Sequence, residues 1–408
     1  MKDIYLQLKY KPRKDKEIIV TFYLESLEGL KKAAVEVAAE SSIGTWTELS
    51  TMTDKIQRKL SAKIFYLDQK KKIIKIAYPL ELFELGNIPQ LLSSVAGNIF
   101  SMKVIKNLRL LDIEFPDKYI NSFTGPKYGL PGIRKIFKIK KRPLVGAIMK
   151  PKVGLDSKTN AKYAYEMWLN GVDLIKDDEN LTDQNFNKFK NRVTEVIKMQ
   201  KKAEKETGNK KVYVFNVTAP SDEMLKRAKF AKQKGGDCVM VDIIATGLDN
   251  VQFLRDQNLS LIIHGHRAGH SLFTRDKRHG MTMLVMAKLA RLAGIDELHT
   301  GTVVGKMEGD AVEVKAINSF LKKSFGKLKP VMPIASGGLH PALVPKLVKI
   351  LGNDLIINFG GGLHGHPDGS AAGARACFAA VEATTKKINL KKYSKNYPDL
   401  KMALDHWN

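Results

Sequence analysis

A lysine and two carboxylates lie close together after a short apolar run. Asp178 and Glu179 offer the hard oxygen ligands that Mg²⁺ prefers, and Lys176 comes just before them. A lysine near other positive charges has a lowered pKa and more neutral amine, and we expect Lys150 and Lys152 to supply that charge. A neutral amine can add CO₂ and become a carbamate, which is a third anionic oxygen ligand. These residue types predict a magnesium site built around a reactive lysine.

Each part of this cluster also has a simpler interpretation. Adjacent carboxylates are common on protein surfaces, so Asp178 and Glu179 also fit an exposed acidic loop. Lys176 also fits a lysine that is merely paired with Asp177 or Asp178. The choice between these interpretations depends on the elements that position the residues.

Glycines follow two later apolar runs and are typical of sites that bind anions. Gly337 and Gly338 come directly after Ser336, and Gly360 and Gly361 begin a second group. Backbone N–H groups exposed by glycine can approach a phosphate closely. The alternative for either pair is a tight turn.

Basic residues provide a second candidate anion site. His266, Arg267 and His299 could hold a phosphate, and two anion sites together imply a substrate with two phosphate groups. The alternative is that the histidines pack behind the site, and we assign His264 and His270 to such packing.

The segment from Gly301 to Gly309 has the features of a closing lid. It has glycines at both ends and Lys306 near its middle. The glycines would act as hinges, and the lysine would carry a positive charge to the reaction centre.

Apolar runs predict the elements that position these residues. From about residue 143, strand-sized runs alternate with helix-sized amphipathic stretches, which indicates βαβ units and buried parallel strands. One such stretch keeps helical spacing from Phe186 to Ile197, and Gly208 follows as a stop signal. The polar clusters follow six of the runs, where barrel enzymes place their active sites. Eight successive runs predict a closed (β/α)₈ TIM barrel: 144–149, 172–176, 212–217, 238–243, 259–264, 297–300, 331–335 and 355–359.

Residues 1 to about 115 have a different order of elements. We expect a strand at 17–24, a helix at 27–39, a hairpin of strands at 64–67 and 73–78, a helix opened by Pro89 and a strand near 102–111. This βαββαβ order predicts an α+β ferredoxin-like N-terminal domain. The expected parts are an N-terminal domain at 1–115, a linker at 116–142 and a barrel catalytic domain at 143–408.

Composition limits the possible functions. The chain is 44% hydrophobic and 27% charged, which fits a folded protein. No apolar run approaches the ~20 residues that cross a bilayer, and the first residues lack the pattern of a signal peptide. We therefore expect no membrane partner and a cytoplasmic location. Cys238 and Cys377 lie in apolar runs and are expected to be core residues without a disulfide.

The formal net charge of +26 raises the possibility of a polyanionic partner. The lysines are scattered along the chain, however, and no helix-turn-helix, zinc-finger or aromatic RNA-binding pattern accompanies them. We expect a solvated basic surface and no specific nucleic-acid binding.

Taken together and in this order, the polar segments resemble the large subunit of ribulose-1,5-bisphosphate carboxylase/oxygenase (RuBisCO), from about residue 10 to the C-terminus. The segments that carry the resemblance are 40–47 (ESSIGTWT), 97–98 (GN), 150–155 (KPKVGL), 171–179 (GVDLIKDDE), 264–268 (HGHRA), 299–309 (HTGTVVGKMEG) and 336–338 (SGG).

The resemblance implies a role for each site residue. Lys176 would become carbamylated, bind Mg²⁺ together with Asp178 and Glu179, and remove the C3 proton of ribulose 1,5-bisphosphate. After CO₂ adds at C2 of the resulting enediolate, Lys306 would stabilise the new carboxylate. Hydration and C2–C3 cleavage would follow, and Lys150 would protonate the final carbanion, which gives 3-phosphoglycerate. O₂ could add in place of CO₂. The expected substrate-contacting residues are His266, which also handles protons, and Lys152, Arg267, His299, Ser336, Gly337, Gly338, Gly360 and Gly361.

The resemblance also implies a shared active site. Glu40, Thr45, Trp46 and Asn98 would reach into the barrel of a second subunit, so the smallest active unit would be a homodimer, alone or within an oligomer of dimers. The chain begins close to its first strand and ends at Asn408, which is similar to archaeal type III members that need no small subunit. Such an enzyme would serve nucleotide (AMP) salvage or a fixation cycle.

Two other functions remain open at this point. A RuBisCO-like enolase or isomerase of a phosphorylated ketose would share the barrel and the metal, but the intact segment around Lys306 argues against it. A basic nucleic-acid-binding protein on an inactive scaffold is the other alternative. Ala147 stands where many family members have threonine, which affects local packing.

Overall fold

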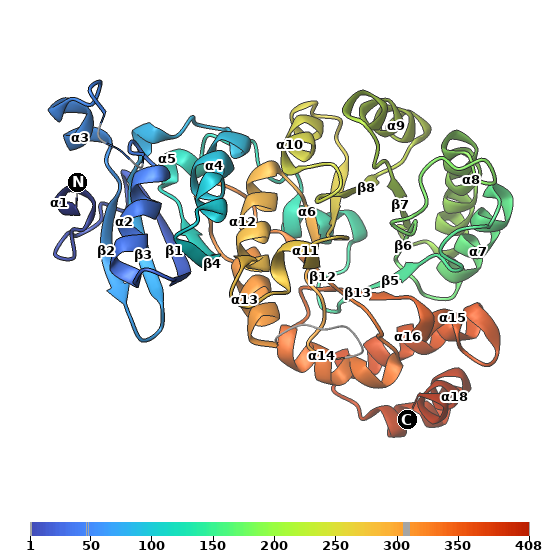
Figure 1. Cartoon of the computed structure of the whole chain (residues 1–408). Helices are drawn as coiled ribbons and strands as arrows, with labels where there is room; N and C mark the ends of the chain where they lie inside the picture. The colour runs from blue at the N-terminus through green and yellow to red at the C-terminus, as the bar shows by residue number, and fades with distance from the viewer. Residues whose placement is uncertain (1, 46, 48, 305–310, 408) are drawn as a thin grey trace. The chain divides into compact units, whose positions relative to one another are not determined.

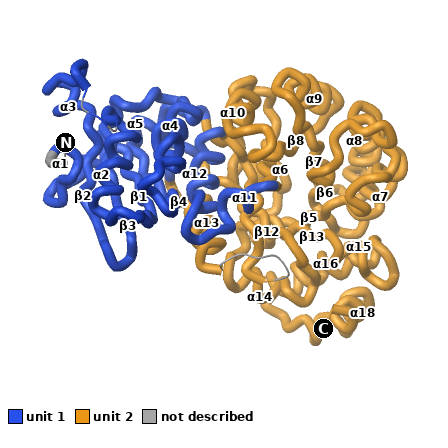
Figure 2. Tube along the Cα trace, viewed as in Figure 1, with its two compact units in different colours: residues 1–124, 269–293, 325–328 blue, residues 125–268, 294–324, 329–408 orange. Residues whose placement is uncertain are grey.

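A computed structural model of the chain describes residues 2–45, 47, 49–304 and 311–407. It divides into two compact units (Figure 2). The first comprises residues 1–124, 269–293 and 325–328, and the second comprises residues 125–268, 294–324 and 329–408. The predicted boundaries at 115 and 143 stay a prediction of where separately folding domains begin and end.

A five-stranded sheet forms the centre of the first unit, in the order β10-β4-β1-β3-β2. Figure 1 labels β1, β2, β3 and β4 of this sheet. The central strand β1 (Glu17–Ser26) pairs antiparallel with β3 (Ile73–Pro79) and with β4 (Ile105–Glu114), and β2 (Lys63–Asp68) forms the expected hairpin with β3. Between the strands run α2 (Leu30–Glu40), which packs on β1 and β2, and α4 (Ile88–Val95), with Pro89 in its first turn. The ferredoxin-like prediction is confirmed.

Some details of this unit differ from the prediction. Helix α2 begins three residues later than expected, because Gly29 has φ 95° and turns the chain before Leu30. Strand β10 (Gly280–Met281) adds a parallel edge next to β4, and so short a strand leaves no periodic signal in the sequence. The other helices of the unit are α1 (Lys2–Tyr5), α3 (Asp54–Leu60), α5 (Asp117–Ile120), α11 (Ser271–Thr274) and α12 (Met283–Ala293).

A closed barrel of eight parallel strands forms the second unit, in the order β11-β12-β13-β5-β6-β7-β8-β9. Each predicted run overlaps one of these strands, so the predicted barrel is confirmed. The strands are β5 (Leu144–Ile148), β6 (Leu174–Lys176), β7 (Val212–Asn216), β8 (Cys238–Asp242), β9 (Ile262–His266), β11 (Glu297–His299), β12 (Met332–Ser336) and β13 (Ile356–Phe359).

Helix α6 (Gly129–Phe137) covers the amino end of the barrel. Its Ile133 and Phe137 pack against Leu144, Val212 and Cys238, which begin strands β5, β7 and β8. The segment expected to be a linker therefore contributes to the core of the second unit. The carboxyl ends of the strands lie at the other end of the barrel, where the polar clusters were predicted.

Helices of the second unit connect barrel strands or follow the last of them, β13. The longest is α8 (Phe189–Thr207), which ends as predicted at Gly208, in the left-handed conformation with φ 66°. The others are α7 (Ser157–Leu169), α9 (Ser221–Lys234), α10 (Leu248–Asp256), α13 (Ala311–Lys322), α14 (Val344–Leu351), α15 (Gly361–His364), α16 (Gly369–Thr385), α17 (Leu390–Tyr393) and α18 (Pro398–His406).

Two local predictions in the second unit are wrong. Phe186 precedes helix α8 and is exposed, because the chain still turns there before the helix begins. Strand β9 begins at Ile262 rather than at 259, because Asn258 and Ser260 have positive φ angles of 51° and 54° and keep the chain in a turn. As a result His266 is the last residue of the strand.

Two absences can be stated for the part of the chain described above. No helix within it is long and apolar enough to cross a membrane. Cys238 and Cys377 are both buried and free, as predicted.

Candidate active site

Lys176 is the last residue of strand β6, and Asp178 and Glu179 follow it at the carboxyl end of the barrel. The Lys176 Nζ lies 3.6 Å from Glu179 Oε2. Lys150, which follows β5, donates a hydrogen bond of 2.7 Å to Asp178 Oδ2. Lys152 lies further out, with its Nζ 3.8 Å from Glu179 Oε1. The barrel thus brings together the predicted magnesium ligands and the predicted acid.

The structure contradicts the exposed acidic loop and does not pair Lys176 with the Asp177 carboxylate. Asp178 is only 1% exposed, so it does not lie on an exposed acidic loop. The Lys176 amine donates to the backbone oxygen of Asp177 at 2.8 Å, not to its carboxylate. That carboxylate instead contacts the guanidinium of Arg192 at 3.1 Å and accepts a hydrogen bond of 2.8 Å from the Tyr213 hydroxyl. Asp177 therefore has a structural role: its carboxylate contacts Arg192 and Tyr213 and is not paired with Lys176.

The pKa of Lys176 is lowered, as predicted, but for a different reason. Complete burial of the amine lowers its pKa, whereas the neighbouring carboxylates, Glu179 and Asp178 first, act in the opposite direction. The expected repulsion from Lys150 and Lys152 is not among the main causes. Strand β6 itself produces the effect, because it ends with the lysine side chain inside the barrel.

Positive neighbours keep the Glu179 carboxylate ionised. Burial alone would raise the pKa of Glu179, but the charges of Lys176, His266 and Lys152 outweigh it and lower the pKa to about 2. The Nε2 atom of His266 lies 3.7 Å from Glu179 Oε2, and its Nδ1 lies 2.9 Å from Asp242 Oδ1. Asp242, which the sequence analysis missed, thus orients the His266 ring beside the predicted ligands.

A second group of buried polar residues lies on strands β9, β11 and β12. His264, assigned to packing from the sequence, contacts Glu297 Oε2 through Nδ1 at 2.8 Å and His299 Nε2 through its own Nε2 at 2.7 Å. His299 Nδ1 then contacts Ser336 Oγ at 2.8 Å. The sequence contained a signal for this group: His264 and His266, and likewise Glu297 and His299, are two positions apart, so each pair points to the same side of its strand.

The predicted anion-binding residues lie on neighbouring segments of the second unit. Arg267 follows β9, and its guanidinium lies against Gly301, at the start of the predicted lid. A Cβ atom added at Gly360, after β13, would lie 3.6 Å from Lys150 Cε, so this glycine loop is next to the predicted acid. Gly337 and Gly338 have φ angles of 111° and 65°, as expected for a turn that exposes backbone N–H groups.

These residues fit a magnesium ion bound through a carbamate. The carboxylates of Asp178 and Glu179 both face positively charged groups, a place that suits a divalent cation. The Lys176 amine has no oxygen to offer, and CO₂ added at its nitrogen would supply the third oxygen ligand.

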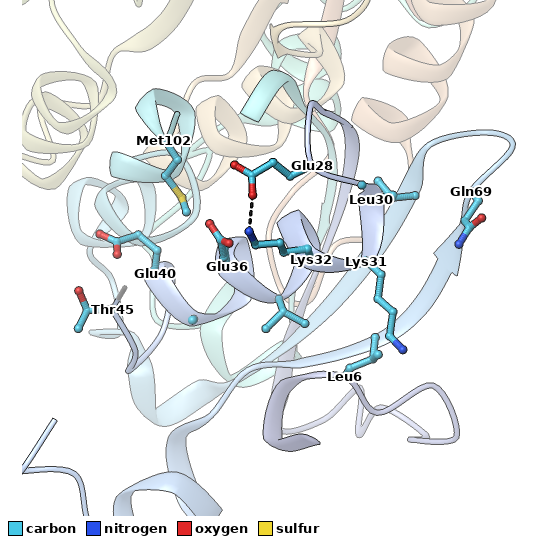
Figure 3. A pocket seen from close by; sticks show the side chains of 13 residues that line it. Leu6, Glu28, Leu30, Lys31, Lys32, Glu36, Glu40, Thr45, Gln69 and Met102 are labelled. Atoms are coloured by element: carbon cyan, nitrogen blue, oxygen red, sulfur yellow. Dashed lines mark hydrogen bonds and ion pairs between the residues drawn. The ribbon is translucent and has the colours of Figure 1, made fainter. Parts of the chain in front are cut away.

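Glu40, Thr45 and Asn98 lie in the first unit, at or after α2 and at the start of a short 3₁₀ helix. Glu40 and Thr45 line a groove of about 610 Å³ over α2 (Figure 3). Trp46 and Lys306 lie outside the described residues.

Fold and site together define a barrel enzyme with a lysine and carboxylate centre at the carboxyl ends of its strands. Residues 4–119 match the N-terminal domain, and residues 129–407 the catalytic domain, of the ribulose bisphosphate carboxylase large chain. The chain belongs to this family, so the predicted family and class of enzyme are confirmed.

Archaeal relatives are similar over the full length. The ribulose bisphosphate carboxylase of Methanocaldococcus jannaschii is 47% identical, with 99% of each chain covered, and that of Pyrococcus furiosus is 48% identical, with 99% of this chain and 97% of the relative covered. Among solved structures, the octameric Rubisco of Pyrococcus horikoshii has a TM-score of 0.95 and 46% identity, covering 98% of this chain and 96% of that one. The dimeric archaeal Rubisco of Hyperthermus butylicus has a TM-score of 0.92 and 42% identity, covering 99% and 98%.

Proposed function

We propose that this chain carboxylates ribulose 1,5-bisphosphate and cleaves the product to 3-phosphoglycerate, with O₂ as an alternative to CO₂. The observation that carries the proposal is the buried Lys176 amine, which has a lowered pKa and lies 3.6 Å from the Glu179 carboxylate. A buried amine that loses its proton easily can add CO₂, and the released proton leaves with solvent. The carbamate formed at Lys176 would join Asp178 and Glu179 as a ligand of Mg²⁺.

The chain's own residues would move protons around the substrate. The carbamate oxygen of Lys176 would remove the C3 proton, and His266, held by Asp242, would handle protons on the substrate oxygens. Lys150 lies next to Asp178 and the loop at Gly360, where it would protonate the last carbanion. When bound, Mg²⁺ would polarise the substrate carbonyl and stabilise negative charge on the substrate oxygens.

The remaining predicted residues would hold the substrate. Gly337, Gly338, Gly360 and Gly361 would offer backbone N–H groups to one phosphate, and Arg267 would bind the other. Lys306 would approach the new carboxylate. Lys152 and Ser336 would complete the substrate contacts, and His299, predicted as a contact from the sequence, would act on the substrate through Ser336.

We also propose that the active unit is a homodimer, alone or in an oligomer of dimers, without a small subunit. Glu40 and Thr45 support this, because they line a surface groove of the first unit, with Asn98 in the same unit. These residues, together with Trp46, would complete the active site of a second subunit. The predicted cytoplasmic location and the boundaries 1–115 and 143–408 stay proposals.

The direct test is incubation with ribulose 1,5-bisphosphate, Mg²⁺ and labelled CO₂. Labelled 3-phosphoglycerate is expected, and preincubation with CO₂ and Mg²⁺ should raise the rate. Lys176→Ala should abolish product formation in a folded protein. Activity that survives Lys176→Ala, or that ignores preincubation, would remove the carbamate from the mechanism.

Lys306→Ala separates a carboxylase from an enolase. Proton abstraction depends on Lys176, so the variant should still exchange the C3 proton of the substrate with solvent. It should form about 10²–10³ times less product, because one preorganised positive charge is missing where negative charge develops. Equal losses of exchange and product would place Lys306 in the first step instead.

A further inference from the structure

Four side chains form a continuous hydrogen-bonded chain from the barrel core to the active site. Its order is Glu297, His264, His299 and Ser336, with consecutive distances of 2.8, 2.7 and 2.8 Å. The first three side chains are at most 2% exposed, whereas Ser336, at the carboxyl end of β12, is partly exposed. Both ring nitrogens of His299 are used within the chain. A substrate would therefore meet the Ser336 hydroxyl, and His299 would act through it.

One proton decides the direction of all three hydrogen bonds. If Glu297 is protonated, it donates to His264 Nδ1, His264 Nε2–H donates to His299 Nε2, and His299 Nδ1–H donates to Ser336 Oγ. The Ser336 hydroxyl is then free to donate to a ligand. If Glu297 is ionised, every bond reverses, and Ser336 must donate to His299 and can only accept from a ligand.

We propose that Glu297 and His264 are positioning residues that act through His299 to orient the Ser336 hydroxyl as a hydrogen-bond donor toward the anionic substrate. The inference rests on the proposed function, since it takes ribulose 1,5-bisphosphate as that substrate. An anion needs donors, and a reversed chain would present it with an oxygen lone pair.

The surroundings of Glu297 favour the donating direction at neutral pH. Burial, with the nearby charge of Asp296, raises the pKa of Glu297 to about 8. Asp296 is itself paired with Arg255 of α10. Burial also lowers the pKa values of His264 and His299 well below the ordinary value, so both rings are neutral.

The other titratable groups near these four hydrogen-bonded side chains either lower the pKa of the histidines or stay neutral. Lys176 of β6 and His266 of β9 contribute to lowering the pKa of His264, and His266 acts on His299 as well. Cys238 of β8 is another titratable group close to Glu297, and its pKa is raised well above the ordinary value, mainly by burial. Its thiol therefore remains uncharged.

A metal ion is a less suitable explanation for the same residues. Ligand atoms of Cys238, His264 and Glu297 lie within 4.8 Å of one another, as they would around a metal. A metal requires a thiolate and a carboxylate, however, and burial favours the protonated form of both groups. The direct bond of 2.8 Å between Glu297 and His264 also satisfies both side chains without an ion.

The kinetic test compares the KM for ribulose 1,5-bisphosphate at pH 7 and pH 9 in the wild type, Glu297→Gln and Cys238→Ala. The amide of Glu297→Gln does not titrate and can donate to His264 Nδ1 at both pH values, so the direction of the hydrogen bonds in this variant should not change with pH. We expect the KM of the wild type to rise about tenfold or more relative to that of Glu297→Gln over this range. Effects of pH on the substrate and on activation are common to both proteins, so they cancel when the KM of the wild type is divided by the KM of Glu297→Gln.

Cys238→Ala is the matched control. It alters the same part of the core and removes one of the three side chains that could hold a metal, but it leaves Glu297, His264, His299 and Ser336 unchanged. It should follow the wild type. If it follows Glu297→Gln instead, or if the wild type and Glu297→Gln change in parallel, the proposal is wrong.

A second measurement needs neither activity nor a variant. In wild-type protein with ¹⁵N-labelled histidine and no substrate, NMR should show His264 and His299 changing tautomer together between pH 7 and pH 9, as the proton of each ring moves to its other nitrogen. Fixed tautomers over this range would overturn the proposal. If the wild type makes no product but this exchange occurs, the proposed function fails while the orienting chain stands.

Discussion

At the scale of single residues, three consecutive acids have different tasks. Asp178 and Glu179 face the lysines of the candidate active site, whereas Asp177 faces Arg192, Tyr213 and the backbone N–H of Asn216. Asp177 and Arg192 are both completely buried. Their ion pair joins the end of strand β6 to α8 and so fixes the loop that carries the predicted metal ligands.

Removing Arg192 should therefore destabilise the protein strongly. Arg192→Met would leave the Asp177 carboxylate buried without its cation, which typically costs about 3–5 kcal/mol. Denaturant unfolding of the variant and the wild type measures this loss. Lys226→Met is a suitable control, because the pair of Lys226 and Asp222 is exposed and should contribute little. A loss for Arg192→Met no larger than that of the control would contradict the assigned role.

At the scale of elements, Gly208 and Gly361 both have room for a Cβ atom, but they differ in backbone conformation. A Cβ atom at Gly208 or at Gly361 would meet nothing within 4 Å. Gly208 ends α8 with φ 66°, a conformation that side chains rarely adopt. Gly361 begins α15 after strand β13 and has no positive φ. The protein alone does not require glycine at 361, whereas a phosphate approaching the backbone would.

Alanine should affect stability at position 208 and substrate binding at position 361. Gly208→Ala should lower the free energy of unfolding by about 1 kcal/mol and leave the KM for ribulose 1,5-bisphosphate unchanged. Gly361→Ala should leave the thermal midpoint unchanged but raise the KM, because a methyl group would stand where the phosphate approaches. Melting curves and steady-state kinetics of both variants decide this. An unchanged KM for Gly361→Ala would move the phosphate site away from the β13 loop.

At the scale of the whole molecule, the residues predicted for the site lie in both units. Lysines, carboxylates and histidines lie in the second unit, and Glu40, Thr45 and Asn98 lie in the first. Sharing of residues between two copies of the chain is therefore a central part of the proposed function.

Mixed subunits test this sharing. Glu40→Ala and Lys176→Ala should each be inactive, but a dimer with one subunit of each kind contains one intact site. After free exchange in equal amounts, half of the dimers are mixed, so about a quarter of wild-type activity should return. Lys176→Ala mixed with Asp178→Ala is the control. Both changes affect the same barrel, so no intact site can form. Equal recovery in both mixtures, or none in either after proven exchange, would argue against a shared site.

The sequence by itself determined the fold and the family, and it predicted the residues of the site. Buried parallel strands leave continuous apolar runs, so eight runs predicted eight barrel strands, and the polar residues after them predicted which end carries the chemistry. The residue order in segments such as 171–179 was enough to place the chain in its family.

Only the tertiary structure decided where each side chain of the site points and what sets its charge. The sequence could not separate Asp177 from Asp178, nor show that burial lowers the pKa of Lys176, nor connect Glu297 to Ser336 through two histidines. The physical reason is that spacing along one strand fixes only the face on which a residue lies. Hydrogen-bond partners and desolvation depend on neighbouring strands, which are far apart in the sequence and meet only when the barrel closes.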